Sequence, residues 1–338
     1  MAARSPSIIR RSLLYGKAGL LTLDGMPRLT PPSVPGSSQK MLTKSLGLKS
    51  DNVTYDLEDS VTPSLKDTAR NQLREHISNL KARPSGISEL AVRINAVSTP
   101  FALSDLTTLA PLSHVDAVVV PKVNSAADLT FVTDVLRHVA PERHTAEADN
   151  PIKIIALIES ARSIMDLAQI SKASPYLSGF IFAAEDFALD LSLTRTPSLT
   201  EFLYARSAIV TAARAAGLPS AIDLVCTSYK GEQGLKTLEE ECAGGKSIGF
   251  NGKQCIHPSQ VEVVQRMFAP NQDEVEWAIR IAIADEKASA SGRGAWTLDG
   301  KMIDAPVVGK AGAVIVKAEQ CGIDVQSLRN KWKGQEPE

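Results

Sequence analysis

The chain has 338 residues, of which 43% are hydrophobic and 22% charged, and its formal net charge is −1. This composition is typical of a globular protein with a well-filled core. The balanced charge argues against a nucleic-acid partner, which would require a basic excess. No run approaches the roughly 18 apolar residues of a membrane span, so no membrane partner is expected. The four cysteines lack zinc-site spacing and the histidines are scattered, so carboxylates must hold any metal.

The N-terminal residues are basic. Arg4, Arg10, Arg11 and Lys17 precede the first acid, Asp24. This pattern is typical of a mitochondrial presequence. Alternatively, residues 1–9 form a short basic tail of a cytoplasmic protein, and the first strand opens at residues 10–15. The sequence leaves both interpretations open.

Apolar, β-branched runs alternate with amphipathic helical patterns along residues 10–268, which indicates βα units and a parallel sheet. Eight such runs, each followed by a helix, predict a TIM (β/α)8 barrel. No GxGxxG turn follows the first strand, so a dinucleotide-binding fold has no support. The expected strands are residues 11–15, 53–57, 90–95, 117–120, 152–158, 179–184, 220–225 and 247–250.

The chain continues beyond the barrel. Helical patterns and a stretch of small residues predict a C-terminal helical lid or arm over residues 269–325. The polar residues 326–338 are expected to form a disordered tail.

Charged residues cluster where the expected strands end, whereas strand interiors carry almost none. In a TIM barrel the carboxyl ends of the strands form the active-site face. The charged positions at or just beyond strand ends are Asp56, Glu58, Asp59, Arg93, Lys122, Glu159, Glu185, Asp186 and Asp223.

Two acids on neighbouring strand ends, Glu159 and Asp186, suit a hard cation. Mg²⁺ is usually held by one or two carboxylates, with water and substrate oxygens completing its coordination. The alternative is that both acids cap the helices that follow them. Strand alternation sends Ile158 towards the helix layer if Glu159 faces the barrel mouth.

Arg93 is expected in the same mouth, where it can pair with a substrate carboxylate or with the Asp56–Asp59 cluster. These acids are too close in sequence to be metal ligands together, so at least one orders metal-bound water or an arginine. His257 precedes Pro258 at a helix start, and a capping role is favoured over a catalytic one. Cys255 has no paired base and is rejected as a nucleophile.

Several motifs in order along residues 10–320 resemble those of the citrate lyase beta subunit family, including its citramalyl-CoA and malyl-CoA lyases. They are Val34-Pro35-Gly36, Asp56-Leu57-Glu58-Asp59, Val92-Arg93-Ile94-Asn95, Val120-Pro121-Lys122-Val123, Ala156-Leu157-Ile158-Glu159, Ala184-Glu185-Asp186-Phe187, Gly249-Phe250-Asn251-Gly252-Lys253-Gln254 and Met302-Ile303-Asp304-Ala305-Pro306.

The resemblance implies a Mg²⁺-dependent carbon–carbon lyase that acts on an acyl-CoA thioester and a keto acid. It implies that Glu159 and Asp186 bind Mg²⁺, that Arg93 contacts the keto acid, and that Asp304 on the lid is the catalytic acid or base, presented to a neighbouring subunit of a homotrimer. It also assigns CoA binding to Tyr15, Lys40, Lys44, Arg70, Gln254 and Cys255.

One departure concerns the first strand. In the family the Arg10–Tyr15 motif leads directly into Val34-Pro35-Gly36, whereas here the 18 residues 16–33 intervene. Such an insertion is expected to interrupt the strand, and we interpret it as a retained intron, which transcript sequencing tests. Two alternative functions stay open: an aldolase acting on free 4-hydroxy-2-keto acids, and a catalytically impaired scaffold.

Overall fold

The structure is a computed structural model that describes residues 9–17, 46–47 and 49–338. It divides into two compact units, Met1–Gln265 and Arg266–Glu338. Among the described residues, no helix is long and apolar enough to cross a membrane.

The first unit is built around a closed barrel of eight parallel strands. Each strand pairs with its neighbours in chain order, and β1 closes the ring by pairing with β8, with Ser12 opposite Lys253. This confirms the predicted TIM barrel. The strands are β1 Ser12–Lys17, β2 Ser50–Asp56, β3 Ile87–Arg93, β4 Ala117–Val120, β5 Lys153–Ile158, β6 Leu177–Phe182, β7 Ser220–Asp223 and β8 Gly252–Cys255.

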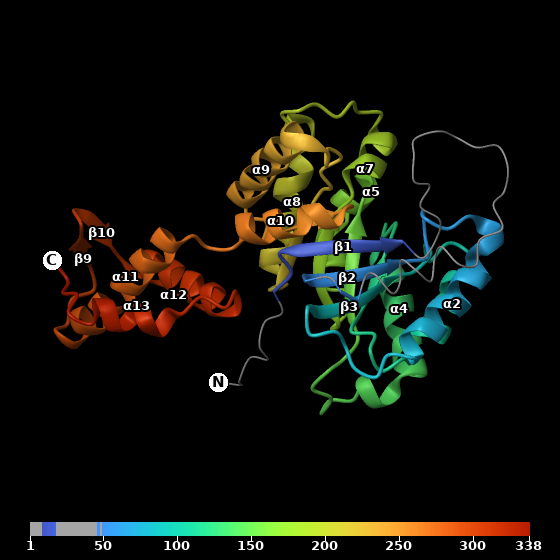
Figure 1. Ribbon diagram of the computed structural model, residues 1–338, viewed down its shortest axis with the longest axis horizontal. Coiled ribbons are helices and arrows are strands. Elements are labelled where there is room, and N and C mark those ends of the chain that lie inside the picture. Colours follow the sequence, from blue (N-terminus) through green and yellow to red (C-terminus); the bar gives the residue numbers. More distant parts are fainter. Residues whose placement is uncertain (1–8, 18–45, 48) are drawn as a thin grey trace. The chain divides into compact units, whose positions relative to one another are not determined.

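Helices surround the strands on the outside of this unit (Figure 1). They are α2 Lys66–Ser78, α3 Ala102–Leu109, α4 Ala126–Val139, α5 Ala161–Met165, α6 Leu167–Ile170, α7 Ala184–Leu191, α8 Leu203–Ala215 and α9 Gly231–Ile248, with short 3-10 turns at Pro63–Leu65, Pro141–Arg143, Thr200–Phe202 and Pro258–Gln260. The next helix, α10 Val261–Phe268, begins in this unit and ends in the second one.

Strand alternation fixes which side chains fill the barrel. Ile155 and Leu157 of β5 lie in the inner apolar cluster with Leu13 and Ile181, so the next residue of that parity, Glu159, continues on the same face. The closure between β1 and β8 requires a glycine: a Cβ on Gly252 would lie 1.9 Å from the carbonyl oxygen of Arg10. The backbones there are too close for any side chain.

Arg10 and Glu89 form a buried ion pair inside the barrel unit. The Arg10 guanidinium binds both Glu89 oxygens, at 2.5 and 2.7 Å, and donates to Ser178 and Ser220. Both side chains are almost completely buried. Arg11 forms a second pair, with Asp51 at 2.8 Å. Arg10 and Arg11 therefore belong to the barrel, in agreement with the interpretation that the first strand opens here.

β1 runs without interruption through Lys17, which lies opposite Asp56 of β2. The first two residues of the insertion, Gly16 and Lys17, therefore continue the strand. Residues 18–33, the rest of that insertion, lie outside the described residues.

The position of the eighth strand also differs from the prediction. Residues 247–250 lie at the end of α9, where Gly249 adopts the left-handed conformation (φ 109°) that terminates helices. β8 follows at Gly252–Cys255. The prediction was wrong because a short apolar run before a glycine is compatible with either element.

The second unit has its own hydrophobic core, in which α11 Gln272–Ala290 packs with α12 Ala305–Gln320 and α13 Val325–Trp332. A hairpin of β9 Trp296–Leu298 and β10 Lys301–Ile303 turns at Asp299 and Gly300. Both turn residues have positive φ, 50° and 70°, as a two-residue type I′ turn requires.

The predicted disorder of residues 326–338 is wrong. These residues include most of α13, and Glu338 exchanges two backbone hydrogen bonds with Thr297. The segment is polar in composition, but Leu328 and Trp332 pack against the core of the second unit. The indole N–H of Trp332 also donates to Glu276 at 2.8 Å. A few well-spaced apolar anchors are sufficient to order a polar segment.

Candidate functional site

The centre of the barrel mouth is a bidentate pair between Arg93, at the end of β3, and Asp56, at the end of β2. Two guanidinium nitrogens of Arg93 each lie 2.7 Å from an Asp56 oxygen. Burial alone would raise the pKa of Asp56, but the pair with Arg93 reverses this and holds it below its ordinary value. The predicted contact between Arg93 and the acidic cluster is therefore present, and Asp56 orders the arginine.

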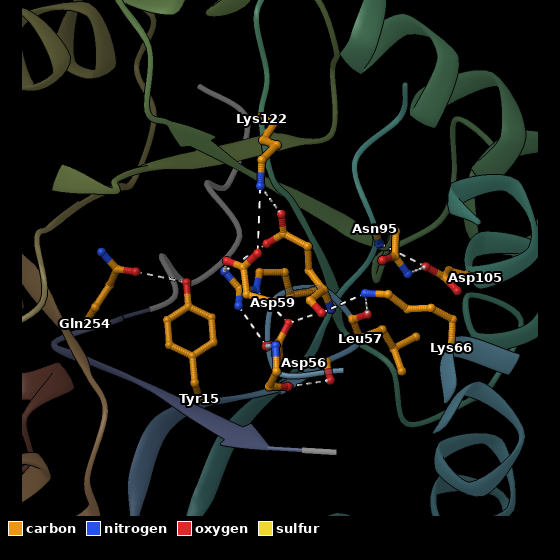
Figure 2. Close-up of polar contacts among 12 residues, drawn as sticks. Tyr15, Asp56, Leu57, Asp59, Lys66, Asn95, Asp105, Lys122 and Gln254 are labelled. Atoms are coloured by element: carbon orange, nitrogen blue, oxygen red, sulfur yellow. Dashed lines mark hydrogen bonds and ion pairs between the residues drawn. The ribbon is translucent and has the colours of Figure 1, made fainter. Parts of the chain in front are cut away.

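The residues after Asp56 form a tightly held loop (Figure 2). The backbone N–H of Glu58 donates to Asp56 at 2.8 Å. Lys66 of α2 donates to the carbonyl oxygens of Leu57 and Glu58, each at 2.7 Å. Glu58 lies 3.1 Å from the Arg93 guanidinium, and burial raises its pKa despite that contact. Asp59 is more exposed and lies 3.6 Å from Arg93.

Glu159 follows β5 on the inward face and is buried, while Asp186 lies in the first turn of α7, after β6. Neither acid caps its helix: Ser160 caps α5, and α7 has no side-chain cap. The helix-capping alternative is therefore wrong for both residues. Burial, and then the like charges of Asp186 and Glu58, raise the pKa of Glu159 to about 7.

These two acids fit a magnesium ion chemically. Their mutual repulsion is the kind that a divalent cation relieves, and hard carboxylate oxygens are the ligands that Mg²⁺ prefers. No group of three or more potential ligands forms a metal cage among the described residues. Two protein carboxylates are the usual complement for Mg²⁺, whose remaining positions are filled by water and substrate oxygens.

Lys122 completes the mouth from the end of β4, and the sequence analysis assigned it no role. Its ammonium group lies 2.5 Å from Glu58, and its backbone N–H donates to Glu159. It has a positive φ of 52°, which is uncommon for a residue with a side chain. The sequence does show a lysine directly after a proline at a strand end, which indicates a charged group at the mouth. The left-handed backbone conformation of Lys122 could not be predicted from the sequence.

Tyr15 of β1 and Gln254 of β8 lie side by side at the mouth. The Tyr15 hydroxyl donates to Gln254 at 2.9 Å, and the Arg93 guanidinium carbon lies 4.8 Å from the Tyr15 ring centre. Burial raises the pKa of Tyr15 strongly. The structure thus brings Tyr15, Gln254 and Arg93 together.

Cys255 does not lie with them. It is fully buried on the opposite face of β8 from Gln254. Burial and then the nearby Cys242 of α9 raise its pKa. The prediction that Cys255 lines the groove beside Gln254 is therefore wrong, because neighbouring residues of a strand face opposite sides.

Arg70 lies on α2, where it binds Asp105 at 2.7 Å and Asp67 at 2.6 Å. Asp105 in turn accepts two hydrogen bonds from Asn95, beyond the end of β3. One guanidinium nitrogen of Arg70, Nη2, is buried and makes no hydrogen bond with a described residue. The other predicted CoA-binding cations, Lys40 and Lys44, lie outside the described residues.

Asp304 belongs to the second unit, where it caps α12 and accepts from the backbone N–H of Val307 at 3.2 Å. His257 caps the 3-10 turn at Pro258–Gln260, with Nδ1 accepting from the backbone N–H of Ser259. This confirms the capping interpretation of His257.

Comparison with known proteins places this barrel in a family. A family model described as HpcH/HpaI aldolase/citrate lyase matches residues 33–258. Citrate lyase subunit beta of Haemophilus influenzae is 36% identical over 286 residues, which cover 85% of this chain and 95% of that protein. The mitochondrial citramalyl-CoA lyase of Rattus norvegicus is 31% identical over 302 residues, covering 87% of this chain and 86% of that protein.

Solved structures agree. The structure of CitE from Mycobacterium tuberculosis in complex with magnesium, acetoacetate and coenzyme A has a TM-score of 0.67 and is 28% identical, covering 92% of this chain and 98% of that one. A citrate lyase from Burkholderia xenovorans has a TM-score of 0.73 at 18% identity, which shows the shared fold. The chain belongs to the HpcH/HpaI aldolase/citrate lyase family and is a carbon–carbon lyase.

Proposed function

We propose that this protein is a Mg²⁺-dependent lyase that cleaves or forms a 3-hydroxyacyl-CoA, with citramalyl-CoA and malyl-CoA as the candidate esters. The observation that carries the proposal is the pairing of two mutually repelling carboxylates, Glu159 and Asp186, with a fixed arginine, Arg93, in one barrel mouth. The CitE neighbour, which binds magnesium and coenzyme A, supports the same chemistry.

In this proposal Glu159 and Asp186 would hold the cation, which would supply Lewis-acid polarisation of the keto-acid portion of the substrate. During cleavage the substrate hydroxyl gives its proton to solvent water, and its oxygen becomes the carbonyl oxygen of the keto acid as the carbon–carbon bond breaks. The electron pair of that bond forms the acetyl-CoA enolate. Arg93 has N–H groups fixed by Asp56 and Glu58, and it stabilises the developing negative charge. Asp304 donates a proton to the enolate carbon, or removes one in the condensation direction.

We also propose which residues bind CoA. Tyr15 and Gln254 lie at the mouth itself. Arg70 contributes its Nη2 group, and Lys40 and Lys44 complete the proposed set. Cys255 is excluded because it faces the helix layer.

The first test is an assay of citramalyl-CoA and malyl-CoA with purified protein, in Mg²⁺ and in EDTA, beside Glu159→Gln. We expect release of pyruvate or glyoxylate together with acetyl-CoA, and no activity in EDTA or in the variant. Keto-acid release that persists in EDTA would overturn the metal assignment.

The same assay separates the proposal from its alternatives. A relative from Cereibacter sphaeroides, 32% identical, is a (3S)-malyl-CoA thioesterase. A thioesterase would release a free CoA thiol, which a thiol reagent detects, whereas lyase cleavage leaves the thioester intact. An aldolase would cleave free 4-hydroxy-2-keto acids but neither CoA ester. The scaffold alternative predicts no turnover of any substrate.

We further propose that Asp304 acts on the active site of a neighbouring subunit in a homotrimer. Subunit exchange between Arg93→Ala and Asp304→Ala proteins, each inactive alone, then restores activity. Because a trimer formed at random contains intact combinations of barrel and Asp304, roughly a quarter of the wild-type rate is expected at equal mixing. No recovery after verified exchange would show that Asp304 serves its own barrel or has no catalytic role.

Mitochondrial import is a proposal that rests on an N-terminal sequence with no acid before Asp24 and with Arg4 ahead of the barrel. Because Arg10 and Arg11 are structural, residues 1–9 are the candidate signal. Fusion of residues 1–9 to a fluorescent protein tests whether they suffice for import.

A further inference from the structure

Lys122 has a backbone conformation that favours glycine. Its φ of 52° lies in the left-handed region, where a Cβ crowds the following carbonyl group. A lysine in this conformation persists only if its surroundings hold it there, and such residues cluster at functional sites. The contacts of Lys122 therefore bear on its role.

Both ends of Lys122 contact the acidic site. The backbone N–H donates to Glu159, one of the two proposed cation ligands. The ammonium group at the other end lies 2.5 Å from Glu58 and 3.8 Å from Asp59. Figure 2 shows the Lys122 side chain pointing down towards Asp59 from the top of the view, whereas Lys66 approaches from the right.

The positive charge of Lys122 remains accessible from the mouth. Its side chain is 43% exposed, against 13% for Arg93, the other cation of the cluster. Arg93 is committed to Asp56 by two hydrogen bonds. Glu58 takes one N–H group of Lys122 at bonding distance, so N–H groups of its ammonium are available to an incoming anion.

We propose that Lys122 is a positioning residue whose ammonium charge weakens the binding of a divalent cation alone and favours its binding together with an anionic keto acid. This inference rests on the proposed function, and it assigns Lys122 a role in the order and coupling of binding. The physical reason is the sign of the charge: an ammonium beside Glu58 repels the cation, whereas it attracts the carboxylate that accompanies the cation in the complex.

Isothermal titration calorimetry of Lys122→Met tests the proposal without any assay of turnover. Magnesium chloride is titrated alone, and pyruvate is then titrated at saturating Mg²⁺. We expect the variant to bind Mg²⁺ roughly five- to tenfold more tightly than the wild type, and pyruvate more weakly by a similar factor. Both differences should shrink at high ionic strength, because salt screens charges at a partly exposed site.

Three further variants are controls. Lys122→Arg keeps the charge and should retain wild-type affinities within about twofold. Lys230→Met removes one charge from the loop after β7, where the Lys230 ammonium lies over the Tyr229 ring, and it should change neither affinity. Lys122→Gly tolerates the positive φ and keeps the N–H group, so it should bind like Lys122→Met even if the methionine variant is unstable.

The outcomes are distinct. Failure of the wild type to bind Mg²⁺ would count against the proposed function itself. If the wild type binds Mg²⁺, but folded Lys122→Met and Lys122→Gly both bind it no more tightly, only the role of Lys122 is overturned. Opposite changes in Mg²⁺ and pyruvate affinity, absent from Lys122→Arg and Lys230→Met, would establish it.

Discussion

Two of the bidentate arginine–carboxylate pairs in the barrel unit, Arg10–Glu89 and Arg93–Asp56, lie in different surroundings. Arg10 and Glu89 have side chains that are 0% and 1% exposed, and serine and asparagine groups complete their hydrogen bonding. Arg93 and Asp56 are 13% and 3% exposed, and they are accompanied by Glu58, Asp59 and Lys122. Arg93 and Asp56 join the neighbouring strands β3 and β2, whereas Arg10, which lies just before β1, binds Glu89 of β3. In both pairs, two guanidinium nitrogens contact the two carboxylate oxygens.

The difference between these pairs lies in what remains unsatisfied around them. At Arg10 the charges balance and the polar groups bond to one another, so the pair serves the fold. At Arg93 the acids outnumber the cations, and the pKa of Glu159 rises to about 7 through burial and then repulsion by Asp186 and Glu58. Surplus charge at a solvent-accessible site can be relieved by a ligand, and this is what distinguishes a functional cluster from a structural one.

The largest expected effect is on stability, from Glu89→Gln. This variant leaves the buried Arg10 charge without its partner, which should lower the free energy of unfolding by about 3–5 kcal/mol. Burial alone would raise the pKa of Glu89, but Arg10 and Asn52 hold it below its ordinary value. The stabilisation is therefore present above the unfolded-state pKa and is lost as the pH falls through the folded-state value.

Urea denaturation of the wild type and Glu89→Gln across this acidic range measures the effect. The difference between them should narrow on acidification, while lyase activity of the folded variant should stay near the wild-type level. A variant as stable as the wild type would show that the buried pair contributes little to the fold.

The second effect is on catalysis, from Arg93→Lys. Lysine keeps the charge but cannot make the two parallel bonds to Asp56 and the contact with Glu58. We expect kcat/KM to fall by about 100-fold, with a loss of unfolding free energy below about 2 kcal/mol. Steady-state kinetics and urea denaturation of one preparation give both values. A large stability loss with little kinetic change would make this pair structural, like Arg10–Glu89.

The third effect is a pH dependence of cation binding. Because the pKa of Glu159 is raised to about 7, a proton competes with the cation below that pH. The apparent Mg²⁺ affinity should fall by about tenfold for each pH unit below 7 and level off above it. Calorimetry from about pH 5.5 to about pH 8.5 measures this profile. A flat profile would mean that Glu159 is not the titrating ligand.

The smallest effect is expected from Asp59→Asn. The Asp59 side chain is 58% exposed and lies 3.6 Å from Arg93 and 3.8 Å from Lys122. Exposed ion pairs of this kind contribute about 0.5 kcal/mol or less. The unfolding equilibrium constant and kcat/KM should therefore each change by less than about threefold. A loss comparable to that of Arg93→Lys would give Asp59 a direct part in the chemistry.

The sequence determined the fold class and much of the site because both depend on local periodicity. The charged strand ends predicted a cluster at the mouth, and Asp56, Arg93 and Lys122 belong to it. Two other predicted strand-end acids do not join it: Asp223 pairs with Arg206 of α8, and Glu185 pairs with Arg195. Parallel strands bring their carboxyl ends to one face, so a one-dimensional pattern becomes a three-dimensional cluster without further information. The alternation of side chains along a strand also predicts that the consecutive residues Gln254 and Cys255 face opposite sides of β8.

Tertiary structure decided the rest. The place of β8 depended on where α9 ends, and the order of residues 326–338 depended on packing of Leu328 and Trp332 against another helix. The left-handed backbone of Lys122 and the raised pKa of Glu159 likewise arise from groups that are distant in sequence. Burial and like-charge repulsion are properties of the assembled neighbourhood, so no local pattern in the chain encodes them.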